Sequence, residues 1–391
     1  MKINKHCFPN GLRLVHYEDT STQMVALNIV YDVGARDEHP EHTGFAHLFE
    51  HLMFGGSAHI PDYDTPLQLA GGENNAWTNN DITNYYLTVP KPNVETAFWL
   101  ESDRMLELAF SEQSLEVQRG VVMEEFKQRC LNQPYGDVGH LFRPLAFRVH
   151  PYRWPTIGKE LSHIEQATLD EVKSFFYCFY APNNAVLAVT GNISWDETVK
   201  LTEKWFAPIP RRDVPVRQLP QEPEQTQERR LTVERNVPLD TLFMGYHMCS
   251  REGADYYAFD ILSDILSNGR SSRLNRRLVQ EQNIFSGIDA YISGTRDAGL
   301  LQISGKPAAG VSLEQAEAAV RKELEELQQS PVDGQELEKV KNKFESTQIF
   351  GNINYLNVAT NLAWFELTGK AEDIDLEVER YRSVTTEQLH T

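Results

Sequence analysis

Two histidines four residues apart, with a glutamate between them, constrain this chain more than any other part of its sequence. Residues 47–51 read His-Leu-Phe-Glu-His. On a helix, His47 and His51 lie one turn apart, and Glu50 lies on the same face, three residues from His47. Two imidazoles in this arrangement can hold one metal ion, and a neighbouring carboxylate can take a proton from metal-bound water. The HxxEH order, the reverse of HExxH, therefore predicts a metallopeptidase site.

The sequence around the motif predicts a mostly buried helix. Its apolar residues are Phe45, Leu48, Phe49, Leu52 and Met53. Thr43 is a suitable N-cap, and Gly55 and Gly56 are suitable residues to end the helix. Buried histidine and glutamate side chains need partners. The alternative to a metal site is a core helix whose polar groups are satisfied by other side chains.

The bulk properties exclude several classes of protein. The chain has 391 residues, enough for two domains, and a formal net charge of −19. This charge argues against nucleic acid or an anionic membrane as a partner, and suits a basic or neutral peptide. The sequence contains no run of 18 apolar residues, so no membrane span is predicted, and no signal peptide is visible. The four scattered cysteines predict reduced thiols. We expect a cytoplasmic protein, or a periplasmic one if a leader has been removed.

Hydrophobic patterns divide the chain into two series of strands and helices. Strands are predicted at 24–31, 85–89 and 185–190, and helices at 94–108, 114–129 and 169–180. The segment 208–230 is rich in Pro, Gln, Arg and Glu and lacks periodicity, so it is predicted to be a linker.

Two pairs of similar segments indicate an internal duplication. Residues 167–172 are similar to 384–389, and residues 52–57 to 266–271, at offsets of 217 and 214 residues. The second offset places Ile261 and Ile265 where the first half has the two histidines. The second half is thus expected to keep the helix without the ligands. Chance similarity of short segments is the alternative. Because the second series stops early, we expect the C-terminus to be incomplete.

Several ordered motifs resemble the pitrilysin, insulysin and mitochondrial processing peptidase family of zinc peptidases. They are His47–His51, Gly71–Thr78 followed by Asp81, Thr83 and Tyr85, Arg119–Glu125, and Gly269–Leu274. The resemblance implies an α+β fold with two similar domains, each a mostly antiparallel twisted sheet packed against helices. The expected ranges are 1–207 for the metal-bearing domain, 208–230 for the linker and 231–391 for the second domain.

The resemblance also implies a third ligand for one zinc ion per chain. The family carries a glutamate in a segment reading Arg-x-Val-x-x-x-Glu, which Glu125 completes here. Glu124 is the alternative, because neighbouring helical side chains point about 100° apart. Where the family usually has a second glutamate, seven residues earlier, this chain has Gln118. Its amide is expected to hydrogen-bond the site from outside the ligands.

The expected reaction is peptide hydrolysis. Glu50 acts as general base on water activated by zinc. Residues 74–78 resemble the family's edge strand, which binds an extended peptide through Asn75 and Ala76. Trp77 is expected either to line a side-chain pocket or to pack as an ordinary strand residue. Phe49 is expected to form an apolar subsite near the ligands.

One departure from the family concerns the second half. Active members usually place an Arg and a Tyr, seven residues apart, where this chain has Val279 and Ser286. The hypothesis is that a related subunit without the metal motif supplies them in a heterodimer, or that a homodimer works without them, around a chamber that admits unfolded peptides. A non-catalytic scaffold subunit and a metal-storage protein are the competing hypotheses.

Overall fold

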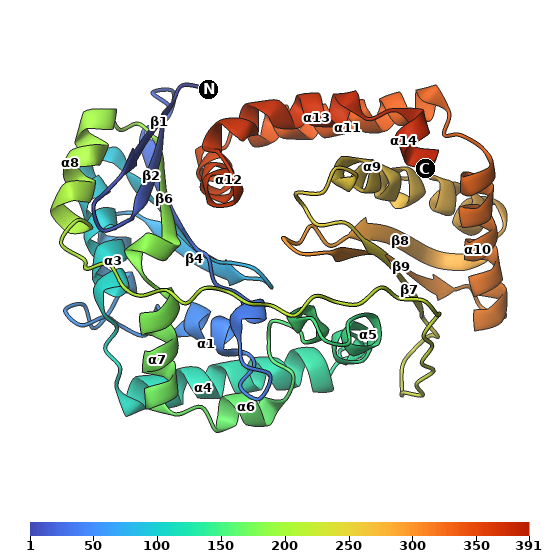
Figure 1. Ribbon diagram of the computed structural model, residues 1–391, viewed down its shortest axis with the longest axis horizontal. Helices are drawn as coiled ribbons and strands as arrows, with labels where there is room; N and C mark the ends of the chain where they lie inside the picture. Colours follow the sequence, from blue (N-terminus) through green and yellow to red (C-terminus); the bar gives the residue numbers. More distant parts are fainter. Residues whose placement is uncertain (391) are drawn as a thin grey trace. The chain divides into compact units, whose positions relative to one another are not determined.

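The computed structural model describes residues 1–390, which form two compact units. The first unit comprises Met1–Arg229 and Gly351–Asp375, and the second comprises Arg230–Phe350 and the residues from Leu376 onward. Each unit combines helices with a sheet of mostly antiparallel strands (Figure 1). The predicted α+β class is confirmed.

The first unit is built on a six-stranded sheet with the order β1-β2-β6-β3-β5-β4. Its strands are β1 (Ile3–Cys7), β2 (Arg13–Glu18), β3 (Met24–Tyr31), β4 (Glu73–Thr78), β5 (Thr83–Pro90) and β6 (Ala185–Gly191). Neighbours are antiparallel except β2 and β6. Strands β3 and β6 are buried almost throughout. Burial on both faces explains their continuous apolar sequences.

Helices cover both faces of this sheet. They are α1 (Phe45–Leu52), α2 (Asp64–Leu69), α3 (Val94–Leu106), α4 (Glu112–Phe126), α5 (Val138–Ala146), α6 (Leu161–Glu165), α7 (Leu169–Phe179), α8 (Trp195–Trp205) and α12 (Tyr355–Thr368). The main core joins α1, α3, α4, α7 and α8 to one face. Helix α12 packs on the other face, against Ala26 and Val30 of β3.

Helix α12 lies in a different unit from the one that its sequence position suggested. The predicted second domain, 231–391, included it, whereas it packs in the first unit. Thr360 donates a hydrogen bond to the side-chain oxygen of Asn28 at 3.1 Å, and Thr190 donates to the Tyr355 carbonyl oxygen at 2.6 Å. The apolar second face of β3 and β6 requires a cover, and the periodicity of a helix does not reveal which sheet it covers.

The second unit has a three-stranded antiparallel sheet of order β7-β9-β8. Its elements are β7 (Leu242–Met248), α9 (Tyr256–Ser267), β8 (Phe285–Ile292), β9 (Gly299–Pro307), α10 (Leu313–Gln329), α11 (Gly334–Gly351), α13 (Glu377–Ser383) and α14 (Thr386–His390). Ile261 and Ile265 of α9 are buried in its core, at 1% and 0% exposure. Where the first half has two histidines, the second half thus has packed aliphatic side chains.

Among residues 1–390, no helix is both long and apolar enough to cross a membrane.

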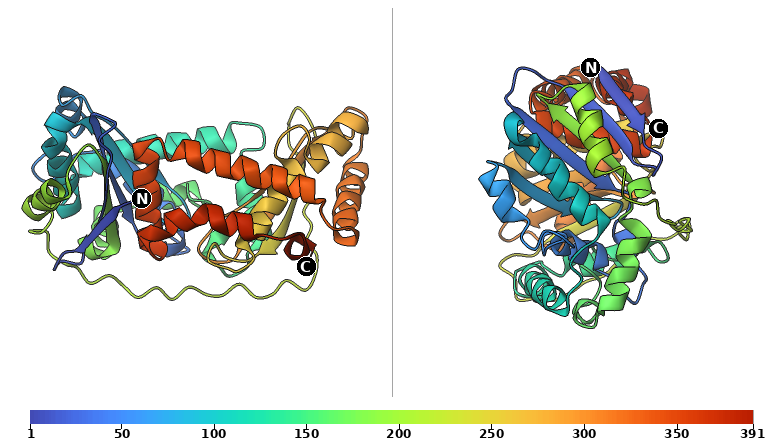
Figure 2. Two further views of the ribbon diagram at one scale, coloured as in Figure 1. Left: turned by 90° about the horizontal axis from the view of Figure 1, so that it is seen from above. Right: turned by 90° about the vertical axis from the view of Figure 1, so that its left-hand side faces the viewer.

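The predicted linker is extended, and most of it is fastened to the first unit. Residues 208–230 contain no helix or strand (Figure 2). Arg212 donates to the Tyr180 carbonyl oxygen at 2.8 Å. The Glu222 carboxylate accepts hydrogen bonds from three successive backbone amides, those of residues 148–150. These contacts make the segment a strap along the first unit, and the name strap is used for it below.

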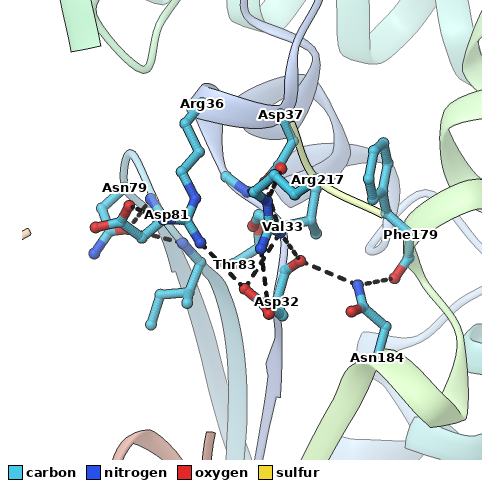
Figure 3. Close-up of polar contacts among 12 residues, drawn as sticks. Asp32, Val33, Arg36, Asp37, Asn79, Asp81, Thr83, Phe179, Asn184 and Arg217 are labelled. Carbon is cyan, nitrogen blue, oxygen red and sulfur yellow. Dashed lines mark hydrogen bonds and ion pairs between the residues drawn. The ribbon is translucent and has the colours of Figure 1, made fainter. Parts of the chain in front are cut away.

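Arg217 of the strap completes a cluster of charged side chains (Figure 3). It pairs with the carboxylate of Asp37 and donates to the Asp32 carbonyl oxygen at 2.8 Å. Beside this pair, Arg36 and Asp81 form an ion pair of 3.1 Å with side chains 4% and 2% exposed. The Asp37 side chain is 2% exposed. The Asp32 carboxylate lies 3.3 Å from Arg217 and 3.5 Å from Arg36, so without Arg217 the three carboxylates of Asp32, Asp37 and Asp81 would be left with Arg36 as the guanidinium of this cluster.

Replacing Arg217 with alanine should therefore destabilise the first unit. Removing one partner of a buried ion pair leaves the other charge uncompensated, which costs about 3 kcal/mol when the lost partner is partly exposed. The measurement is chemical denaturation of both proteins. Arg211→Ala, which removes an exposed arginine from the same strap, should change stability by no more than about 0.5 kcal/mol. Equal effects of the two substitutions would contradict the role given to Arg217.

Candidate metal centre

Helix α1 carries His47, Glu50 and His51, and its first turn is held by a carboxylate from outside the helix. Glu38 accepts hydrogen bonds from the backbone amides of Gly44 and Ala46, both at 2.9 Å. These amides belong to the N-terminal groups that have no partner inside a helix. Burial raises the pKa of Glu38 to about 8, although the two amide bonds act in the opposite direction. Glu38 thus fixes where α1 begins.

The N-cap of α1 is Gly44 rather than the predicted Thr43. Gly44 has φ 90°, which disfavours a residue with a Cβ. A Cβ at this position would lie 2.6 Å from Cδ1 of Ile164. The hydroxyl of Thr43 instead lies 2.9 Å from Nδ1 of His163. The Thr43 hydroxyl also accepts a hydrogen bond from the Lys159 amide at 2.7 Å, so the amides of the first turn are bound by Glu38 instead.

Helix α4 brings Glu125 to the two histidines. Its N-terminus is capped by Ser111, whose side chain accepts from the Ser114 amide. Ser114 in turn donates to the Gly55 carbonyl oxygen at 3.3 Å, which joins α4 to the turn after α1. Oε2 of Glu125 lies 3.3 Å from Nε2 of His51 and 3.6 Å from Nε2 of His47.

These separations fit one zinc ion. Tetrahedral zinc bound at ~2.0–2.2 Å places its ligand atoms about 3.3–3.6 Å apart. One donor atom from each of His47, His51 and Glu125 lies within 4.8 Å of the others, and among residues 1–390 this is the only such group of His, Cys, Asp and Glu. Nδ1 of His47 is buried and has no hydrogen-bond partner there. Nε2 is therefore the ring nitrogen of His47 that faces a polar neighbour.

The surroundings keep His47 neutral. Burial, together with smaller effects of the nearby His51 and Arg129, lowers its pKa to about 3. A neutral imidazole has the free lone pair that a metal ligand requires. This side chain is therefore ready to bind a cation without first losing a proton at neutral pH.

Glu50 faces the same site but is not one of the three grouped residues. Burial raises its pKa above the ordinary value, and a hydrogen bond with the Thr78 side chain partly offsets this effect. The negative charge of Glu125 raises it as well. A carboxyl group with a raised pKa beside a metal site is suited to taking up and returning protons.

Glu124, the alternative third ligand, points elsewhere. Its side chain is 57% exposed and lies 3.8 Å from Lys127, whereas that of Glu125 is 20% exposed. Neighbouring residues on a helix point about 100° apart, so only one of the two can face α1. The structure places Glu125 there.

Strand β4 forms an edge of the first sheet and lies next to α1. Within the described chain it pairs with β5 alone. The backbone amide of Ala76 is hydrogen-bonded to Oδ1 of Asn75 at 2.8 Å, rather than to β5. The amide of Ala76 therefore faces the open edge. Asn75 itself is exposed.

The interpretation of Phe49 as part of a substrate subsite needs correction. Its side chain is 0% exposed and stacks on Tyr180 and Phe175, with ring centroids 5.0 and 5.3 Å away. Two residues after His47, a helical side chain points about 200° around the axis from it. Phe49 therefore faces the core, opposite the ligands.

Two other predicted residues are placed without a demonstrated role. Trp77 is partly buried and packs with the α12 side of the sheet, whereas Ala76 packs with the α1 side. Gln118 is half-buried on α4, with its Cγ near Gly55. In the described residues, no hydrogen bond joins Gln118 to the histidines or to Glu125. Its contribution to the site stays a prediction.

Sequence reasoning missed Arg129. Its Nη2 lies 2.9 Å from Oε1 of Glu125, four residues earlier. Acidic and basic residues at this spacing on a helix form a recognisable pair, so the signal was present. Val279 and Ser286, which the resemblance predicts at the places of the family's Arg and Tyr, lie in the second unit. Val279 is partly buried there, and the hydroxyl of Ser286 donates to the Lys306 carbonyl oxygen.

Two family models match this chain. Residues 13–138 match the model described as Insulinase (Peptidase family M16), and residues 166–344 match the model described as Peptidase M16 inactive domain. The first range contains all three grouped residues, and together the models cover most of the chain. The chain belongs to peptidase family M16. This confirms the resemblance to pitrilysin and insulysin.

Curated M16 relatives are named zinc proteases. Zinc protease PqqE of Helicobacter pylori is 29% identical over 338 residues, covering 85% of this chain and 76% of that protein. Uncharacterized zinc protease YmxG of Bacillus subtilis is 25% identical over 347 residues, covering 88% of this chain and 83% of that protein.

Solved M16 structures share the fold over the full chain. A protease from Helicobacter pylori has a TM-score of 0.92 at 26% identity, covering 100% of this chain and 95% of the other. A peptidase M16 inactive domain from Pseudomonas fluorescens has a TM-score of 0.88 at 17% identity, covering 100% and 94%.

The geometry predicts different effects of substituting the two neighbouring glutamates. Glu125→Gln replaces the carboxylate beside His47 and His51 with a neutral amide. The variant should therefore retain far less zinc than the one ion per chain expected of the wild type. Glu124→Gln changes only an exposed side chain and should retain the wild-type content. Elemental analysis after dialysis against a mild chelator measures both. The reverse order of zinc loss would identify Glu124 as the ligand.

Proposed function

We propose that this chain is a zinc-dependent endopeptidase that hydrolyses extended or unfolded peptides. The observation that carries the proposal is the grouping of His47, His51 and Glu125 at zinc-ligand separations, with Glu50 on the same helix. The zinc-protease names of the M16 relatives support the choice of metal. A metal-storage protein would need neither Glu50 nor the open edge of β4.

The residues divide the chemistry between them. His47, His51 and Glu125 would hold zinc, which when bound polarises the scissile carbonyl and makes water more acidic. Glu50 accepts a proton from the attacking water and delivers it to the leaving amine. A hydrogen bond with Thr78 of β4 favours the charged form of this carboxylate.

The open edge of β4 supplies a way to align the substrate. An extended peptide can add to the sheet as a further strand, with Asn75 and Ala76 at the pairing positions. The bond from the Ala76 amide to Oδ1 of Asn75 would be exchanged for one to the peptide backbone. Strand addition requires an extended chain, which is why unfolded segments are the proposed substrates.

A partner subunit is part of the proposal. Val279 and Ser286 stand at the places where active members of the family usually have Arg and Tyr. A related subunit would then supply these groups in a heterodimer, and a homodimer without them is the second arrangement. The chain would supply the metal half of the active site.

A non-catalytic scaffold is the competing function, because one matched model is described as inactive. That match covers residues 166–344, which contain none of the grouped residues. The description therefore applies to the part of the chain without the metal cluster. The intact His47, Glu50, His51 and Glu125 favour catalysis.

Substituting Glu50 with glutamine separates catalysis from metal binding. The variant should keep wild-type zinc content and lose activity on a quenched fluorogenic peptide by about 10²- to 10⁴-fold, because it lacks the general base. Glu124→Gln is the control, because it removes the same negative charge from an exposed residue outside the site, and it should leave activity unchanged. Turnover by Glu50→Gln near the wild-type rate would exclude Glu50 as the base.

The need for a partner can be tested with the purified chain. We expect low peptidase activity from the chain alone and a clear gain when a related M16 subunit that carries Arg and Tyr at the matching positions is added. Size-exclusion chromatography of the mixture should show a complex. High activity of the chain alone, unchanged by the added subunit, would contradict the heterodimer.

A further inference from the structure

The two carboxylate oxygens of Glu125 have different neighbours. Oε2 faces the ring nitrogens of His47 and His51, while Oε1 lies 2.9 Å from Nη2 of Arg129. Arg129 belongs to the short π-helix Lys127–Leu131 that continues α4. Single π-turns within helices are frequent at functional sites, because they change the direction of the side chains that follow.

We propose that Arg129 is a positioning residue that presents Oε2 of Glu125 to the metal, an inference that rests on the proposed function. By pairing with Oε1, the guanidinium holds the carboxylate plane and leaves one oxygen for the ion. Arginine is not deprotonated in proteins, so the guanidinium keeps its charge throughout the pH range of the assay.

Within the described chain, no other side chain is placed to orient the Glu125 carboxylate by pairing with Oε1. Gln118 occupies the position where related peptidases usually have a second glutamate, and the described chain shows no hydrogen bond from it to Glu125. In residues 1–390 the ion-pair partners of the Glu125 carboxylate are His47, His51 and Arg129. The groups that orient a metal ligand typically contribute about 10- to 100-fold to metal affinity.

An opposing effect makes the proposal testable. Arg129 is a cation beside a cation site, and repulsion alone would make its removal strengthen zinc binding. Its side chain is 68% exposed, however, so water and salt screen that repulsion. Positioning should therefore exceed repulsion, and the sign of the change in affinity distinguishes the two effects.

The neighbouring pair Glu124–Lys127 provides a matched control. Its atoms are 3.8 Å apart, both side chains are exposed, and Glu124 points away from the histidines. An exposed helical ion pair of this kind contributes about 0.3–0.5 kcal/mol and should not affect the metal. Lys127→Ala removes the same charge as Arg129→Ala, from the same helical turn, without touching Glu125.

The experiment measures zinc affinity by competition with a chromophoric chelator for wild type, Arg129→Ala, Arg129→Lys and Lys127→Ala. We expect Arg129→Ala to bind zinc about 10- to 100-fold more weakly, Arg129→Lys to recover part of the loss, and Lys127→Ala to match wild type. With Co²⁺ as the probe, Arg129→Ala should also show an altered visible absorption spectrum, because Oε1 is released. Circular dichroism of the metal-free proteins should be unchanged, since Arg129 is largely exposed.

Three results would overturn the proposal. Equal zinc affinity and cobalt spectra for wild type and Arg129→Ala would show that Arg129 does not orient Glu125. Tighter binding by Arg129→Ala would show that it acts only as a repelling charge. Failure of the wild-type protein to bind zinc would instead reject the proposed function itself, and the role of Arg129 with it.

Discussion

The carboxylate of Glu38 accepts hydrogen bonds from the first turn of α1, and the position of the metal cluster depends on this contact. The residue before it, Asp37, is paired with Arg217 of the strap. One short loop is thus bound on one side to the strap and on the other to the helix that carries His47. Because Asp37 and Glu38 are both buried, the loss of either contact would remove hydrogen bonds from a carboxyl group that water cannot readily reach.

The two units show how helices with a similar apolar pattern can serve two purposes. In the first unit α1 presents His47 and His51 to Glu125, while in the second unit α9 has Ile261 and Ile265 at the corresponding places, buried in a core. The helical pattern of apolar residues is sufficient for folding in both. The chemistry depends on a few polar side chains added to that pattern, which agrees with the general separation of fold from function.

The parts of the site that depend on local geometry could be predicted from the sequence. His47, Glu50 and His51 share a face because of their spacing alone, whereas Glu125 comes from a distant helix and could be found only through family resemblance. The position of Phe49, about 200° around the helix from His47, indicates the core rather than the predicted subsite.

Contacts between distant segments could not be predicted. The strap has no periodicity, so nothing in its sequence shows that Arg217 meets Asp37. The role of Glu38 could not be predicted because the Thr43 hydroxyl contacts His163 and the Lys159 amide, which are far from it in the sequence, and does not cap α1. Helix α12 is rich in apolar residues but has no strongly one-sided pattern, so its sequence does not show which sheet face it covers.

An anomalous-scattering map recorded at the zinc edge from crystals of the zinc-loaded protein tests the central claim most directly. The account predicts one strong peak per chain, within bonding distance of Nε2 of His47, Nε2 of His51 and Oε2 of Glu125. A peak bound to other residues, or no peak in crystals grown with zinc, would contradict it.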